Sequence, residues 1–347
     1  MISIIKVNNR NLVLKKSYNE PNFKGKSVLV NDPWDYVDMW LKRSNNNKKE
    51  EAIFYWQQAK QFYKASLSLP LTSAPLTSYY CFLNATKALL LIRNVSFTDQ
   101  HGVSGKKQNN RKSLASEIVT LKINGILPAL SKCMGDTPLN SRVEHSLKEL
   151  LRNLVYIHRS YCLTYTSESS KELFIPVEDS FFVKEDNSNE CWFSAEIDEK
   201  YATKYTIDKI KRNFKIDDNF PDNYVVRFKT HVDWKGNKTL ENPNFLTYYK
   251  EIRRNVQYIA GSSNRWYIKR SDIDESLPYN SLSITFAAMH RLSELSRYEP
   301  ITLSEHLNSK QNWLLSEFIS SAPYQFIHEI ASEITGDEFL IPRRHLV

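Results

Sequence analysis

Arg152 and His158 are the two residues whose types and spacing have the clearest chemical meaning, in the stretch Arg152-Asn153-Leu154-Val155-Tyr156-Ile157-His158. A histidine exchanges protons with a reacting oxygen near neutral pH. An arginine neutralises the charge that builds on a phosphate, ideally through two parallel hydrogen bonds. Six residues of regular helix turn about 600°, which leaves the two side chains roughly 120° apart. They therefore converge only if the helix ends between them or a second subunit completes the site.

The same stretch resembles the signature of HEPN-type ribonucleases, in which an arginine and a polar residue are followed by a short spacer and a histidine. The resemblance implies a small helical domain that dimerises and cuts RNA without a metal, as in a toxin or an antiviral effector. Arg152 and His158 would be its catalytic residues. Under the alternative, His158 continues the apolar stripe of Leu147, Leu151 and Leu154 and is a packed, hydrogen-bonded core histidine.

A second candidate is the polar segment 94–113, which we expect to form a loop. Within it, Lys106, Lys107, Arg111 and Lys112 stand in seven residues without an acid. Four such cations would grip a nucleic-acid backbone; the alternative is a solvated loop. A third candidate is a polar site made of His101, Arg297, Tyr298 and Glu299. Arg297 and Glu299 would bind an anionic ligand there, or form a polar network where a helix ends before Pro300.

Composition sets wider limits on the class of protein. The 347 residues carry a formal net charge of +8, with a pI near 9.0. Part of that excess would serve RNA or DNA; the alternative is an ordinary surface, because the charge is not concentrated in one dense tract. The 8 glycines argue against a glycine-rich phosphate cradle. The four cysteines are too far apart for a zinc site, so we predict no metal and no cofactor.

The start of the chain lacks the apolar stretch of a signal peptide, and no apolar run is long enough to cross a membrane. We therefore predict a cytoplasmic protein that does not span a membrane. Apolar spacing predicts helices over 34–41, 50–66, 75–93, 114–121, 142–159, 245–259, 281–297, 302–319 and 323–335. Alternation and β-branched runs predict strands over 173–177, 191–197, 224–232 and 265–269.

These elements predict an α+β protein with a mostly α-helical frame and a β-containing middle segment. We expect an N-terminal extension with short strands (1–30), a helical region that the HEPN-type stretch would make HEPN-like (31–160), a β-containing middle region (161–270) and a C-terminal helical region (271–347).

At three places the sequence also resembles the bacterial YaaC-like family. They are Leu69-Pro70-Leu71 with Tyr79–Leu90; His101-Gly102-Val103-Ser104 with Leu121–Pro128; and Leu295–Pro300 with Trp313–Phe318 and Ile334-Thr335-Gly336. The resemblance implies a bacterial intracellular protein with a helical frame, and brings no catalytic residues with it. Because it spans both helical regions, we expect them to pack together. Two hypotheses follow: an RNA-cleaving protein that acts as a homodimer, or a non-catalytic binding or scaffold protein with a protein or nucleic-acid partner.

Overall fold

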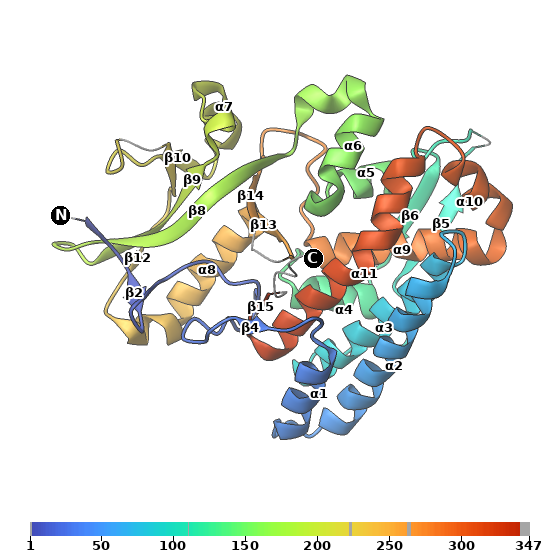
Figure 1. The fold of residues 1–347 in the computed structure, drawn as a ribbon, viewed down its shortest axis with the longest axis horizontal. Coiled ribbons are helices and arrows are strands. Elements are labelled where there is room, and N and C mark those ends of the chain that lie inside the picture. The colour runs from blue at the N-terminus through green and yellow to red at the C-terminus, as the bar shows by residue number, and fades with distance from the viewer. Residues whose placement is uncertain (1, 110, 222–223, 262–264, 341–347) are drawn as a thin grey trace, which may run out of the picture. The chain divides into compact units, whose positions relative to one another are not determined.

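A computed structural model describes residues 2–109, 111–221, 224–261 and 265–340 (Figure 1). The chain divides into two compact units. The helical unit comprises residues 30–171 and 277–335, and the sheet unit comprises residues 1–29, 172–276 and 336–347. In the described part of the chain, no helix has both the length and the apolar character needed to cross a bilayer.

The helical unit is built around α3 (Ala74–Ile92), which is apolar on almost every side and therefore buried. It packs against α2 (Lys49–Ser68), α9 (Ser281–Tyr298) and α11 (Asn312–Thr335). Phe82 of α3 stacks on Phe326 of α11 with ring centroids 4.1 Å apart. The N-terminal and C-terminal helices thus share one core, which confirms the predicted packing of the two helical regions. α1 (Trp34–Arg43) and α10 (Pro300–Leu307) complete this frame.

A small antiparallel sheet lies in the same unit, with the order β5 (Val103–Lys107), β6 (Glu117–Leu121) and β7 (Val143–Ser146). The helix predicted over 114–121 is therefore wrong, and the predicted loop over 94–113 contains a strand. The β-branched Ile118 and Val119 favour a strand that is paired on both sides and buried on both faces. α4 (Ile126–Cys133) lies between β6 and β7 along the chain.

The single helix predicted over 142–159 is also wrong, because this segment forms several short elements. A capping box between Ser146 and Glu149 starts α5 (Leu147–Arg152) after β7. Extended backbone at Leu154 then interrupts the helix. The chain continues with η1 (Val155–Ile157), α6 (His158–Thr164) and η2 (Thr166–Lys171).

The sheet unit holds a curled antiparallel sheet with the order β10-β11-β9-β8-β14-β13; β1 also pairs with β8, and β12 with β9. Its strands are β1 (Ile2–Ile4), β8 (Phe174–Glu185), β9 (Glu190–Ile197), β10 (Phe214–Ile216), β11 (Val225–Phe228), β12 (Val232–Asp233), β13 (Val256–Ile259) and β14 (Arg265–Lys269). The β-containing middle segment is therefore confirmed. The short elements η3 (Glu199–Tyr201), α7 (Lys204–Ile210) and η4 (Asn237–Glu241) lie between these strands.

Alternating side chains of β8 cover both faces of this sheet. Phe182 packs with Phe193 on one face, against Phe245 of α8 (Pro243–Asn255). Phe181 packs with Trp192 on the other. The helix predicted over 245–259 ends at Asn255, because the β-branched and aromatic residues that follow pair as β13.

Three segments distant in sequence build the sheet unit. The N-terminal hairpin of β2 (Lys6–Val7) and β3 (Arg10–Asn11) turns at Asn8 and Asn9, whose φ angles of 51° and 60° suit a type I′ turn. β4 (Val28–Leu29) pairs in parallel with β15 (Phe339–Leu340). The buried hydroxyl of Tyr249 on α8 reaches the carbonyls of Lys15 at 2.6 Å and Ser17 at 2.9 Å.

We expect Tyr249→Phe to lower the free energy of unfolding by about 1–3 kcal/mol, because it leaves buried carbonyl groups without their donor. Urea unfolding followed by tryptophan fluorescence measures this change. Tyr267→Phe is the matched control, since Tyr267 is only partly buried on β14. Equal stability of the two variants would mean that the Tyr249 hydroxyl does not hold the N-terminal segment.

Candidate functional site

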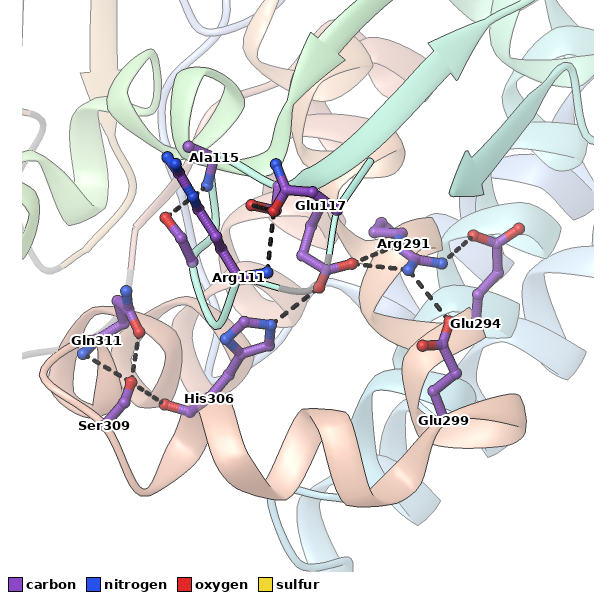
Figure 2. A network of polar contacts seen from close by, with 12 residues as sticks. Arg111, Ala115, Glu117, Arg291, Glu294, Glu299, His306, Ser309 and Gln311 are labelled. Carbon is purple, nitrogen blue, oxygen red and sulfur yellow. Dashed lines mark hydrogen bonds and ion pairs between the residues drawn. The ribbon is translucent and has the colours of Figure 1, made fainter. Parts of the chain in front are cut away.

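Glu117, the first residue of β6, carries a fully buried carboxylate in the helical unit. Its Oε2 accepts hydrogen bonds from Arg291 Nη2 at 2.7 Å and Nε at 3.1 Å, and its Oε1 lies 3.0 Å from His306 Nε2. Figure 2 shows these two partners approaching the carboxylate from opposite sides. A buried charge is stable only when it is paired in this way. β6 is therefore tied to α9 through Arg291 and to α10 through His306.

Arg291 extends these contacts into what we call the Glu117 network: Glu117, Arg291, Glu294, Glu299 and His306. The guanidinium lies 3.3 Å from Glu294 Oε2 and 3.3 Å from Glu299 Oε1 (Figure 2). One fork of N–H donors thus serves three carboxylates, a task that suits arginine.

The charges of this network shift the pKa values of Glu117 and Arg291. Burial alone would raise the pKa of Glu117, but hydrogen bonds from His306 and Arg291 outweigh it and hold that pKa below its ordinary value. Burial works against the charge of Arg291, yet its bonds with Glu117 and the nearby Glu294 raise its pKa. Glu117 and Arg291 are therefore both charged at neutral pH and form a buried ion pair.

Strand β5 approaches the Glu117 network at Gly105, whose backbone N–H donates to Glu294 Oε1 at 3.1 Å. A Cβ atom at this position would collide with the Arg291 Cδ and the Glu294 carboxylate. A larger residue at this position would therefore have to displace the side chains of Arg291 and Glu294.

A cluster of rings, formed by Tyr79, His101 and His290, adjoins the same network. The Tyr79 hydroxyl is hydrogen-bonded to His101 Nδ1, and the Tyr79 ring lies 4.9 Å from that of His290. His290 Nδ1 is 3.8 Å from Glu294 Oε1. Burial lowers the pKa of His290 to about 3, and burial also lowers the pKa of the more exposed His101. Both imidazoles are therefore neutral at pH 7.

Comparison with known proteins gives one match. The model of the YaaC-like Protein family matches residues 9–334. The chain belongs to the YaaC-like family. Neither the curated proteins nor the solved structures gave a match to it.

In the Glu117 network of this YaaC-like protein, every member is hydrogen-bonded or ion-paired to another member. Two members of the predicted polar site reach it: Glu299 directly, and His101 through the ring cluster. Arg297 instead lies over the exposed ring of Tyr298, at 4.9 Å. The arrangement fixes the positions of β5, β6, α9 and α10. Among the three histidines of the Glu117 network and the ring cluster, only His101 has an exposed side chain, and an exposed imidazole is suited to proton exchange.

Arg152 and His158, the predicted catalytic pair, lie where α5 ends and α6 begins. The helix does end between them, which is one of the two conditions for their convergence. Both are buried, with exposed fractions of 4% and 7%. Arg152 lies 3.7 Å from the Glu168 carboxylate, and His158 Nε2 lies 3.6 Å from Cys162 Sγ. Burial, with the charges of Arg152 and Arg159, lowers the pKa of His158 to about 4. This burial favours the packed-histidine alternative.

Of the four cations that we predicted to contact nucleic acid, two form ion pairs and two do not. Lys106 is paired with Glu144 at 2.6 Å, and Lys112 with Glu305 at 2.7 Å. Lys107 and Arg111 have no ion-pair partner among the described residues. Half of the local positive charge is thus already neutralised.

Sequence reasoning missed Glu117, Arg291 and the role of His306. Glu117 directly precedes the apolar Ile118 and Val119, and Arg291 interrupts the apolar face of α9. Two opposite charges within buried runs signal an internal ion pair. Which two residues pair cannot be read from the sequence, because they are 174 positions apart and only the fold brings them together.

We expect Glu117→Gln to lower the free energy of unfolding by about 3–5 kcal/mol at neutral pH, because it leaves the buried Arg291 without its main counter-charge. Thermal and urea unfolding measure the loss. Glu144→Gln is the control, since it breaks the exposed pair with Lys106 and should leave the melting temperature nearly unchanged.

The stabilisation by Glu117 should also depend on pH. A carboxylate whose pKa falls on folding stabilises the protein fully above its unfolded pKa of roughly 4.5, and this stabilisation is lost as the pH falls through the lowered pKa. The difference in stability between the wild type and Glu117→Gln should therefore shrink below about pH 4.5. A constant difference down to pH 3 would contradict the ion pair.

Proposed function

We propose that this YaaC-like protein binds nucleic acid and does not cut it with Arg152 and His158. The observation that carries the proposal is a groove in the sheet unit, of about 240 Å³, where three cations meet a single carboxylate. We call it the basic groove; it is lined by Arg212, Asn213, Phe228, Lys229, Thr230, Glu251, Arg254 and Asn255.

Hydrogen bonds fix the floor of the basic groove. Asn213 donates from its side chain to Asn255 Oδ1 at 2.6 Å, and its carbonyl accepts from the backbone N–H of Lys229 at 2.9 Å. Asn255 in turn donates to the carbonyl of Glu251 at 2.8 Å. The end of α8 and the segments beside β10 and β11 thus hold the cations on a fixed support.

The charges of the basic groove suit phosphodiesters. Arg212 and Lys229 are exposed, and neither has an ion-pair partner in the part of the chain that the structure describes. Residues 209–215 hold four cations and no acid; of these cations Arg212 lines the groove, and Lys211 is paired with Asp208 at 3.7 Å. Seven of the eight lining residues are polar or charged, and several cations in one groove favour a polyanion over a single phosphate.

Burial of Arg152 and His158 supports binding over cleavage. A ribonuclease needs its base and its phosphate-binding cation to reach the scissile bond, whereas these side chains are engaged inside the helical unit. Cleavage by Arg152 and His158 is the competing hypothesis, and a homodimer and a cytoplasmic location stay predictions.

We expect Arg212→Gln and Lys229→Gln each to weaken binding of a fluorescein-labelled single-stranded RNA, measured by fluorescence anisotropy. Each variant should reduce the slope of log affinity against log salt by about 0.7, as one phosphate contact is lost on a single strand. Lys238→Gln, an exposed lysine of η4 outside the groove, is the matched control. Unchanged affinity and slope in both groove variants would exclude this site.

The same RNA tests the competing hypotheses. The wild type should leave it intact, with and without EDTA. Metal-independent cutting that His158→Ala abolishes, in a variant with an unchanged melting temperature, would overturn the proposal in favour of the ribonuclease. Lys107→Gln and Arg111→Gln separately test the predicted contact in the helical unit. A smaller slope of log affinity against log salt in these variants would mean that both units contact the RNA.

A further inference from the structure

A second pocket, of about 250 Å³, lies in the helical unit at the end of β6. We call it the β6 pocket. It is lined by Ser96, Thr98, Leu121, Lys122, Ile123, Asn124, Gly125, Leu127, Pro128, Ala129, Ser131, Lys132, Thr137, Pro138, Leu139 and Tyr279. The lining comes from the loop after α3, the end of β6, the turn between β6 and α4, α4 itself, the loop after α4, and the residue before the N-cap of α9.

The charge of the β6 pocket has one sign. Lys122 and Lys132 contribute two ammonium groups, and no aspartate or glutamate is among the lining residues. Neither lysine forms an ion pair within the described ranges. Lys122 is also half-buried. Two unpaired ammonium groups in a concave site attract an anion.

Hydrogen-bonding groups of the β6 pocket are held in place. Ser131 Oγ donates to Ser283 Oγ at 2.9 Å, which donates to the buried Asp136 at 2.7 Å. The backbone N–H of Asn280, next to Tyr279, donates to the other oxygen of Asp136 at 2.7 Å. Burial and the nearby Asp136 raise the pKa of Tyr279, so its phenol remains a donor at neutral pH.

The remaining walls of the β6 pocket are apolar and include Leu121, Leu127 and Pro128. Ile123 contributes a side chain that is 49% exposed, which is apolar surface that an apolar ligand would cover. Pockets that combine apolar walls with a few fixed polar groups are typical of small-molecule sites.

We infer that the β6 pocket binds a small organic anion, with its carboxylate or phosphate at Lys122 and Lys132 and an apolar body against Ile123 and Leu127. The inference is independent of the proposed nucleic-acid binding, since it concerns another unit and other cations. Charge-assisted hydrogen bonds hold the anionic group, and burial of the apolar body adds affinity that an inorganic ion lacks.

The test uses the fluorescent sulfonate 8-anilinonaphthalene-1-sulfonate as the probe, displaced by phenyl phosphate, benzoate, phenol or inorganic phosphate. We expect the probe to bind the folded wild type and to be displaced by the two aromatic anions. Phenol and inorganic phosphate should displace it at least tenfold less well, because each lacks one half of the required chemistry. If inorganic phosphate displaces the probe as well as phenyl phosphate does, the pocket does not bind an apolar body. If phenol displaces it as well, the pocket does not require an anionic group.

Variants locate the site. Lys122→Gln and Lys132→Gln should each weaken phenyl phosphate about tenfold, the effect of losing a charge-assisted hydrogen bond. Ile123→Thr should weaken phenyl phosphate without changing the response to inorganic phosphate. Lys64→Gln, on α2 outside the pocket, is the matched control. Wild-type affinity in both pocket lysine variants, at an unchanged melting temperature, would overturn the inference.

RNA affinity measured on the same variants separates the two proposals. The pocket variants should bind single-stranded RNA as the wild type does, while Arg212→Gln should bind phenyl phosphate normally. Loss of RNA binding in Lys122→Gln would mean that the β6 pocket is part of a polyanion site, and would overturn its assignment to a small organic anion.

Discussion

The buried carboxylate of Glu117 is the constraint that ties β6 to α9 and α10 in the helical unit. A negative charge at the start of the central strand of a small sheet requires partners on every side that solvent cannot reach. Arg291 and His306 meet this requirement from two different helices. The same ion pair leaves no space for a side chain at Gly105. Helix packing, strand register and one glycine thus all depend on how a single charge is compensated.

The sequence was most informative where one periodicity dominates. The helices around Trp56 and Phe82 and the strand Arg265–Lys269 were predicted well, because their apolar spacing matches their secondary structure. Prediction failed at 114–121, where an apolar run of β-branched residues suits a buried strand as well as a helix. It failed at 142–159 because the capping box at Ser146, a short-range signal, interrupts a longer apolar pattern.

The candidate sites differ from the sequence interpretation for a related reason. Spacing along the chain places Arg152 and His158 near each other, but it cannot tell whether their side chains face solvent or the core. The structure engages Arg152 with Glu168 and buries His158 beside Cys162. The groove of Arg212, Lys229 and Arg254 escaped notice because its cations come from three separate segments. Of these cations, only Arg212 belongs to a tract of positive residues, 209–215, that the sequence alone displays, and it was not among the predicted site residues.

The discontinuous make-up of the sheet unit has a consequence for how the protein is made. Lys16 donates from its ammonium to the carbonyl of Phe339 and from its backbone N–H to Glu338, and Val28 pairs with Phe339. The ribosome therefore releases Lys16 and β4 more than 300 residues before these partners. The helical unit has all its segments once Thr335 has emerged. During synthesis the sheet unit is completed after the helical unit, so β4 and Lys16 remain without these partners until Glu338 and Phe339 have been translated.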